Sequence, residues 1–314
     1  MNDKISIAIA TFNGEKYIKD QLDSIYTQTL IPDEVIVVDD CSTDRTISIL
    51  NEYKNTYGLK LYINNKNLGL NRNFEKAISL CTSDYIMLCD QDDVWFNHKI
   101  ETTYNKIKAV ENNKPTLVSS NCIDVDSNLK PIAINKNLKD ADSYATTLLG
   151  HHSQGCTLMM NKMLVNKILP FPSDVEYIYD LYIGLTAAMI GNKYYIGEPL
   201  MFYRHHTSNV LGKDIYYKRT IMERIKNKYS KQYPNFIPDE RFKHMRIVHM
   251  KNSNNFIKER ELLFDKILLL ENKLNLFNTI KIILSIKELA INRRVISTFN
   301  MLISKIIANF YSKY

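Results

Sequence analysis

The sequence predicts an α/β fold in which a mostly parallel central sheet is flanked by helices, followed by a helical C-terminal region. Over residues 1–110, short β-rich segments alternate with segments of helical periodicity, which is typical of a parallel sheet with right-handed crossover helices. A polar loop follows each of these strands. After Gly212 the alternation stops, and apolar residues recur three and four apart, as they do on amphipathic helices.

The N-terminal elements follow from periodicity. We expect strands at 5–10, 34–39, 60–64 and 85–89, and helices at 16–28, 43–54 and 70–81. Ser42 or Thr43 is the expected N-cap of the second helix, because a hydroxyl can accept a hydrogen bond from a free backbone N–H of the first turn. The carboxyl ends of parallel strands share one rim of the sheet, where such folds bind ligands.

From about residue 115 the pattern is mixed. It predicts strands at 116–120, 156–161 and 194–203 and a helix at 180–190. Helices are expected at 213–231 and, after Pro234 and Pro238, over 256–277 and 280–310. We therefore divide the chain into a domain at 1–212, with halves 1–110 and 111–212, and a C-terminal region at 213–314.

Composition separates the chain into two electrostatic parts. The 314 residues are 45% hydrophobic and 24% charged, with a net charge of +7, which excludes disordered, collagenous and disulfide-scaffold proteins. Residues 1–212 hold 20 Lys and Arg against 25 Asp and Glu, a net charge of −5, whereas residues 213–314 carry +12. The two parts are therefore interpreted separately. The tail lacks the aromatic interleaving and basic blocks typical of nucleic-acid binding, so no nucleic-acid partner is expected.

The five cysteines and the N-terminus suggest a cytoplasmic protein. The cysteines are odd in number and include no Cys-x-x-Cys pair, which favours reduced thiols over disulfides or a structural zinc site. The chain starts without the long apolar segment of a secretory leader, so none is expected. Charged or amide residues interrupt every apolar stretch of the tail, well short of the ~20 apolar residues that span a bilayer.

Two acidic loops suggest a metal site. Asp90, Asp92 and Asp93 directly follow one predicted strand, and Asp39 and Asp40 end another. Clustered carboxylates repel one another unless a cation or solvent neutralises them, and oxygen ligands suit Mg2+ or Mn2+. The alternative is a solvated turn, or a helix N-cap at Asp92 or Asp93 for a helix starting near Val94.

Phosphate binding would need other groups. Neither a Gly-x-Gly-x-x-Gly fingerprint nor a Walker loop is present, so a bound diphosphate would be neutralised by the metal and by cationic or backbone donors. Arg72 is the candidate cation, the alternative being an ordinary surface arginine.

Four motifs resemble the family 2 inverting glycosyltransferases, which have the Rossmann-like GT-A fold. They are Ile9-Ala10-Thr11-Phe12-Asn13-Gly14, Val38-Asp39-Asp40-Cys41-Ser42-Thr43-Asp44, Asn67-Leu68-Gly69 and Asp90-Gln91-Asp92-Asp93. The resemblance covers residues 4–212. Further segments, Gly155-Cys156-Thr157, Tyr179-Asp180-Leu181-Tyr182 and Tyr203-Arg204-His205-His206, look like the rhamnosyltransferase-like branch, which builds bacterial surface polysaccharides.

The resemblance implies roles for the residues of these motifs. Residues 1–110 would be the nucleotide-sugar half and 111–212 the acceptor half. Thr11 and Asp40 would hold the base and ribose, with Asp39 beside them. The other nucleotide-sugar residues would be Asn13, Gln91, Asp90 on the ribose and sugar side, and Asp93 near the transferred sugar or the acceptor.

The resemblance also implies the metal ligands and the catalytic base. Asp92 and His206 would hold Mn2+ or Mg2+ on the diphosphate, and Asp180 would be the base. Tyr179 stands where the family usually has Glu or His, and we expect this difference to remove a polar neighbour of the base. An inverting transfer requires such a base to deprotonate the acceptor hydroxyl, and a Lewis acid for the leaving group.

The expected function is sugar transfer from a nucleotide diphosphate, with inversion, to a growing glycan that is lipid-linked at the cytoplasmic membrane face. A sugar nucleotidyltransferase is the alternative enzyme, although it would need a Gly-rich basic loop where Thr11-Phe12-Asn13-Gly14 stands. An inactive interaction module is the non-enzymatic alternative. The tail is expected to contact anionic lipid through residues 280–314, or to pack against the catalytic body or a second subunit.

Overall fold

The structure, a computed structural model, describes residues 3–110, 113–134, 147, 154–173, 179–206, 239–269 and 281. The predicted helix at 213–231 lies outside these residues. So does the proposed lipid-contacting segment 280–314, apart from Lys281. No helix within the described ranges is long and apolar enough to cross a bilayer.

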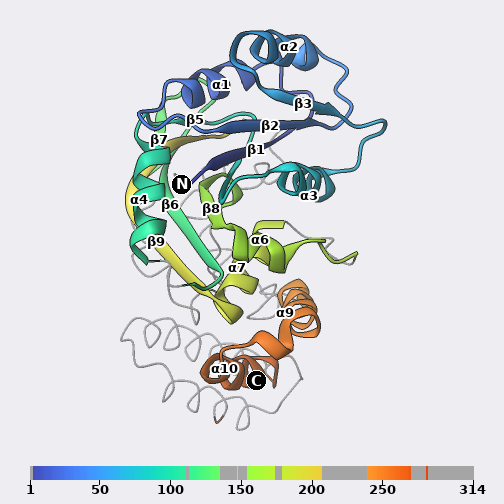
Figure 1. The fold of residues 1–314 in the computed structure, drawn as a ribbon, viewed down its shortest axis with the longest axis vertical. Helices are drawn as coiled ribbons and strands as arrows, with labels where there is room; N and C mark the ends of the chain where they lie inside the picture. The colour runs from blue at the N-terminus through green and yellow to red at the C-terminus, as the bar shows by residue number, and fades with distance from the viewer. Residues whose placement is uncertain are drawn as a thin grey trace, which may run out of the picture.

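A single nine-stranded sheet organises the described chain (Figure 1). Its order is β3-β2-β1-β4-β8-β6-β9-β5, with β7 paired to β6. The strands are β1 (Ile5–Thr11), β2 (Glu34–Asp39), β3 (Lys60–Ile63), β4 (Tyr85–Cys89), β5 (Val94–Trp95), β6 (Thr116–Val125), β7 (Pro131–Ile134), β8 (Leu158–Asn161) and β9 (Asn192–Arg204). The first four are parallel, β8 is antiparallel to both β4 and β6, and β6 is parallel to β9. The expected parallel sheet therefore forms the N-terminal half, and beyond β4 the sheet is mixed.

Helices cover both faces of the sheet. They are α1 (Ile18–Tyr26), α2 (Thr46–Tyr57), α3 (Leu70–Leu80), α4 (Lys99–Val110), α6 (Lys162–Ile168), α7 (Tyr179–Ile190), α9 (Asp239–Asn252) and α10 (Lys258–Leu269). Strand alternation divides the buried side chains between two cores. In β1, Ile7 and Ile9 pack in the core with residues of α1, α2 and α4, whereas Ala8 and Ala10 pack in the core with residues of α3, α6 and α7.

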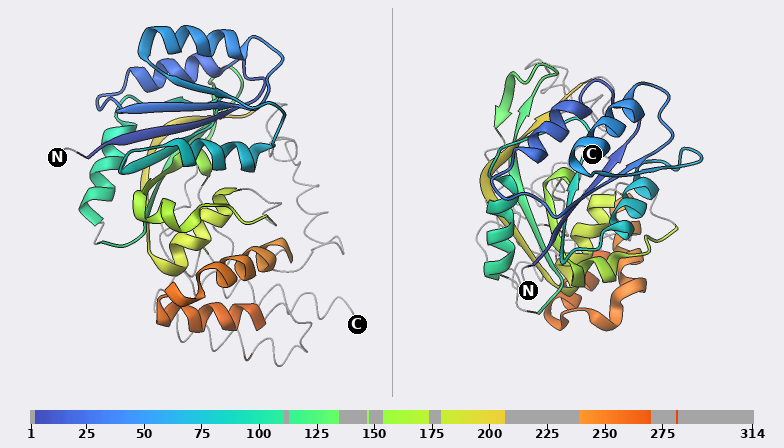
Figure 2. Two further views of the ribbon diagram at one scale, coloured as in Figure 1. Left: turned by 45° about the vertical axis from the view of Figure 1, so that its right-hand side comes forward. Right: turned by 45° about the horizontal axis from the view of Figure 1, so that its top comes forward.

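Helices α9 and α10 extend the second of these cores (Figure 2). Val248 of α9 and Phe264 of α10 are fully buried in the same cluster as Tyr182 of α7. The Arg260 guanidinium also donates hydrogen bonds to the carbonyl oxygens of Ala188 and Gly191, where α7 ends. The described part of the C-terminal region therefore packs directly against the preceding domain.

The expected N-cap of the second helix and the capping alternative for Asp92 and Asp93 are both wrong. Helix α2 begins at Thr46 with Arg45 in the N-cap position. The Ser42 hydroxyl oxygen accepts a hydrogen bond from the Asn13 N–H, and the Thr46 N–H donates to the Asp44 carboxylate instead. Val94 and Trp95 form strand β5, and the next helix starts at Lys99. Asp92 and Asp93 therefore cap no helix.

Candidate active site

The loops after β1 and β2 are joined through one buried carboxylate. Asp39 accepts hydrogen bonds from the Thr11 hydroxyl at 2.8 Å and from the Ser42 backbone N–H and hydroxyl at 2.8 and 2.6 Å. Thr11 and Asp39 are both almost completely buried. Two of the predicted nucleotide residues thus lie together and fix the shape of this rim.

Asp40 organises the loop that leads into α3. Its carboxylate accepts hydrogen bonds from the Asn64 side chain and from the backbone N–H groups of Leu68 and Gly69, at 2.8 to 2.9 Å. Gly69 has a φ of 81°, a conformation that glycine adopts without a steric penalty. Asp40, which with Thr11 is predicted to hold the base and ribose, therefore holds the Asn67-Leu68-Gly69 motif in place.

Gln91 connects the acidic loop to the β1 loop. Its side-chain amide accepts from the Phe12 N–H at 2.9 Å and donates to the Phe12 carbonyl oxygen at 3.1 Å. Gly14 leaves room for this pair, since a Cβ atom there would lie 2.3 Å from the Gln91 oxygen. Asn13, in the left-handed region with a φ of 48°, accepts a hydrogen bond from the Thr43 N–H at 2.9 Å.

Arg72, the candidate phosphate cation, is engaged in a different set of contacts. Its guanidinium donates to the carbonyl oxygens of Phe171 and Pro172 at 3.1 and 3.0 Å and forms an ion pair with Glu75. The charge is thus balanced within the protein, and the side chain fixes the segment after α6.

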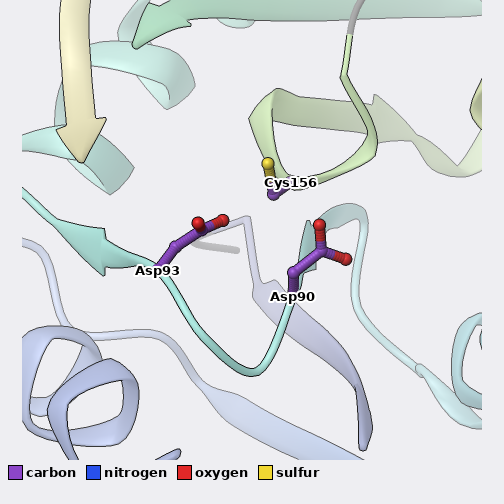
Figure 3. Close-up of side chains that lie close together, drawn as sticks. All are labelled: Asp90, Asp93 and Cys156. Carbon is purple, nitrogen blue, oxygen red and sulfur yellow. The ribbon is translucent and has the colours of Figure 1, made fainter. Parts of the chain in front are cut away.

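Three side chains converge beside the carboxyl end of β4 (Figure 3). Atoms of Asp90, Asp93 and Cys156 that could bind a metal lie within 4.8 Å of one another. Burial raises the pKa of the Cys156 thiol well above its ordinary value, and the two carboxylates raise it further. A protonated thiol donates a hydrogen bond but is a poor metal ligand. Cys156 is therefore interpreted as a donor to the carboxylates rather than as part of a thiolate metal site.

Hydrogen bonds to the acidic loop offset only part of the free-energy cost of burying its carboxylates. Burial, followed by the neighbouring carboxylates of Asp92 and Asp180, raises the pKa of Asp90 to about 7, while hydrogen bonds from Cys156 and Tyr179 oppose the rise. Burial, then Asp92 and Asp90, raises the pKa of Asp93 well above its usual range. One oxygen of Asp93 accepts from the Arg204 N–H at 3.0 Å, and this bond and the Cys156 thiol oppose the rise in the pKa of Asp93. Such a site favours a cation or a hydroxyl donor.

The two predicted metal ligands are in contact. His206 Nε2 lies 2.8 Å from Asp92 Oδ2, and both side chains keep a small exposed fraction, 10% and 15%. Neighbouring ligands of an octahedral Mg2+ ion lie about 3 Å apart when each bond is about 2.1 Å. The separation of these two atoms and their carboxylate and imidazole chemistry therefore fit a divalent cation.

Asp180 lies in the first turn of α7, at the edge of the same cluster. One carboxylate oxygen accepts from the Gly155 N–H at 3.1 Å, and the other is buried with no partner in the described chain. Burial raises its pKa to about 7, although backbone N–H groups of Leu181 and Gly155 oppose the rise. A carboxyl group with this pKa can accept a proton near neutral pH.

Tyr179 lies between the acidic loop and helix α3. Its ring stacks on Phe74 with centroids 4.1 Å apart, and its hydroxyl donates a hydrogen bond that opposes the rise in the pKa of Asp90. The tyrosine is thus a polar neighbour of Asp90, and the expected loss of a polar neighbour of the base Asp180 stays a prediction. Three residues of the site have no role predicted from the sequence: Tyr17, whose ring stacks on the His206 imidazole, Cys156 and Arg204. Cys156 and Arg204 stand in the motifs quoted above, whereas no sequence pattern marks Tyr17.

Comparison with known proteins gives the family. A family profile described as Glycosyl transferase family 2 matches residues 6–169. The chain is 30% identical over 226 residues to a dTDP-rhamnosyl transferase, RfbG, of Shigella flexneri, covering 67% of this chain and 75% of the relative. It is also 31% identical over 106 residues to a cholesterol galactosyltransferase of Borreliella burgdorferi, covering 34% and 30%.

Solved structures share the fold. TarS of S. aureus in complex with UDP-GlcNAc superposes with a TM-score of 0.61 at 19% identity, covering 93% of this chain and 82% of that one. The mannosyltransferase PcManGT from Pyrobaculum calidifontis, with GDP-Man and Mn2+, gives 0.51 at 19% identity, covering 100% and 89%. Together with the profile match over residues 6–169, these relatives show that the chain belongs to glycosyl transferase family 2, has the GT-A fold and is a glycosyltransferase.

Proposed function

We propose that the protein transfers a sugar from a nucleotide-diphosphate donor, with inversion, to a hydroxyl of a growing bacterial surface glycan such as a capsule, O-antigen or cell-wall polysaccharide. The observation that carries this proposal is the convergence of Asp180 with the loop after β4. The Asp180 carboxylate accepts a hydrogen bond from the Gly155 N–H at 3.1 Å, and the next residue, Cys156, has its sulfur within 4.8 Å of the carboxylate oxygens of Asp90 and Asp93. A base and a leaving-group site in one cluster are what a single displacement requires.

Asp180 is the proposed general base. Its buried oxygen without a partner would accept the proton of the acceptor hydroxyl as that oxygen attacks the anomeric carbon. The backbone N–H of Gly155, bonded to the other oxygen, would hold the carboxylate in orientation. Because inversion needs one attack from the face opposite the leaving group, no covalent sugar on the protein is required.

Asp92 and His206 are the proposed ligands of Mn2+ or Mg2+, which when bound would supply Lewis-acid stabilisation of the departing diphosphate. Asp90 and Asp93 would bind hydroxyl groups of the donor or acceptor sugar. Thr11, Asn13, Asp39, Asp40 and Gln91 would shape the nucleotide loops through the hydrogen bonds described above. Arg72 would anchor the segment at Phe171 and Pro172 rather than bind phosphate.

The substrate classes rest on the relatives. One relative is a dTDP-rhamnosyl transferase, and two structural neighbours are complexes with UDP-GlcNAc and with GDP-Man. Both bound ligands are nucleotide-diphosphate sugars, and the name of the relative indicates a third. A hexose or deoxyhexose donor is therefore proposed. The +12 charge of residues 213–314 suits the anionic inner face of the cell membrane, where a lipid-linked acceptor would be met.

A thermal-shift screen of nucleotide sugars, with and without Mn2+, tests this proposal. The true donor should stabilise the protein by about 2.7 kcal/mol at a hundredfold excess over its dissociation constant. This full stabilisation should be reached only when Mn2+ is present. Release of nucleoside diphosphate from that donor, with the product anomer determined by NMR, then tests transfer and inversion. No stabilisation by any nucleotide sugar would contradict the proposal.

A further inference from the structure

Arg204, the last residue of β9, connects three segments around the acidic loop. It is 3% exposed. Its Nε donates to the Asp92 carbonyl oxygen at 2.8 Å, and its two terminal nitrogens donate to the Ser127 carbonyl oxygen and to the Asp20 carboxylate, each at 2.9 Å. A guanidinium is the side chain suited to this task, because its planar fork presents several donors in fixed directions.

The same guanidinium begins a stack that ends at His206. It lies over the Tyr17 ring at 4.5 Å from the ring centroid, and Tyr17 stacks on the His206 imidazole with centroids 4.7 Å apart and an interplanar angle of 29°. His206 in turn contacts the Asp92 carboxylate at 2.8 Å. Arg204, Tyr17, His206 and Asp92 therefore form a closed ring of contacts.

This ring constrains both proposed metal ligands at once. The Asp92 carbonyl is fixed by Arg204, which sets the course of the backbone that carries the carboxylate. The imidazole plane is fixed by Tyr17, which sets the direction of Nε2. Neither Arg204 nor Tyr17 would touch the ion, so both act through the ligands.

We propose that Arg204, through Tyr17 and the Asp92 carbonyl, is the positioning residue that preorganises the Asp92–His206 pair for a divalent cation. This inference rests on the proposed function in assuming that the pair binds metal. Partners that orient metal ligands typically change metal affinity by about 10- to 100-fold when they are removed. A loss of that size is expected on removing Arg204.

The test is a titration of the full chain with Mn2+, in which the EPR signal of free Mn2+ measures how much of the ion is bound. Arg204→Gln should weaken binding about 10- to 100-fold, and Arg204→Lys should restore little of it, because an ammonium cannot reach the carbonyl oxygens of Asp92 and Ser127 together with Asp20. Tyr17→Leu should weaken binding about tenfold, whereas Tyr17→Phe, which keeps the stacked ring, should bind as the unaltered protein does.

Arg260→Gln is the matched control. It also removes a guanidinium that donates to two carbonyl oxygens, but at the far end of α7, so its Mn2+ affinity should be unchanged. If the unaltered protein binds no Mn2+, the metal assignment itself is wrong. If it binds Mn2+ and folded Arg204→Gln and Tyr17→Leu bind equally well, the positioning role is overturned while the metal assignment stands. Tyr17→Leu decides the matter if Arg204→Gln does not fold.

Discussion

Asp180 derives its chemistry from burial without a nearby opposing charge. The groups that favour its ionised form are backbone N–H donors, each weaker than an ion pair, so desolvation prevails and the pKa rises to about 7. A carboxyl with an ordinary pKa would be a poor base for an alcohol, whereas one near 7 still ionises at neutral pH. The same burial makes the ionised residue costly for stability.

Asp180→Asn should therefore remove activity and raise stability together. Transfer should fall by about 10² to 10⁴, while the metal-dependent binding of donor remains. In the free protein above pH 7, unfolding free energy should rise by about 1 to 3 kcal/mol, because a neutral amide replaces a buried charge. Desolvation of the new N–H donors offsets part of this gain. Urea unfolding in EDTA and transfer assays measure the two effects. A variant that is inactive because it is destabilised would contradict this assignment.

The pH dependence follows from the sign of the same shift. The proposed base must be ionised, so kcat/KM, which reports the pKa values of the free enzyme, should rise about tenfold per pH unit below about 7 and level off above it. Stability runs the other way: the folded pKa lies above the unfolded value near 3.9, so the contribution of Asp180 to unfolding free energy falls as pH rises from about 4 to 7. Rate profiles and unfolding curves across this range, with Asp180→Asn as the reference, check both slopes. A flat profile of kcat/KM would refute the base assignment.

Residue type alone could not separate Arg72 from Arg204. The sequence singled out Arg72 because it stands where a loop at the predicted rim leads into a helix. The Phe171 and Pro172 carbonyls that it binds lie about 100 residues further on. Tyr17 likewise carries no motif, since its role depends on a histidine almost 190 residues away. The local sequence shows which residues are charged. It does not show which distant residues the fold places in contact with them.

At the element scale, apolar periodicity predicted those strands and helices that bury one regular face. Strand β2 was predicted with its observed bounds, and β1 and α3 to within one residue, because their apolar residues repeat with a clear period. Strand β5, only two residues long, and helix α4 were missed. Val94 and Trp95 are paired to β9, whose Phe202 and Met201 are distant in sequence, so no local signal distinguishes them from a loop.

Two glycines in and after α7 test how closely that helix is fitted. A Cβ at Gly191 would lie 1.9 Å from the Pro115 carbonyl oxygen. Because this oxygen belongs to the backbone, it cannot move aside as the end of a flexible side chain can, so Gly191→Ala should lower unfolding free energy by about 2 to 4 kcal/mol. A Cβ at Gly184, within the helix, would meet nothing within 4 Å, so Gly184→Ala should raise it by up to about 1 kcal/mol. Chemical denaturation of both variants measures the contrast, and equal effects would show that close packing after α7 is not the cause.

At the scale of the whole molecule, the buried hydrophobic residues form two separate cores. One lies between the sheet and α1, α2 and α4; the other runs through α3, α6 and α7 to α9 and α10. Asp180 lies in the first turn of α7, a fully buried helix of this second core. The boundary after residue 212 was predicted from a change in charge and periodicity. These features indicate surface charge and secondary structure, and they do not predict buried contacts such as that of Phe264 with the core around α7.

Because that core is continuous, damage to α10 should spread to the catalytic part. Phe264→Ala removes a fully buried ring and should lower unfolding free energy by about 3 to 5 kcal/mol. Leu262→Ala, on the same helix but 50% exposed, should change it by less than about 1 kcal/mol. Hydrogen exchange of the α7 amides should accelerate only in the Phe264 variant, since α7 and α10 then open as one cooperative unit. If exchange in α7 stays unchanged while α10 loses protection, the C-terminal helices unfold separately from the catalytic body.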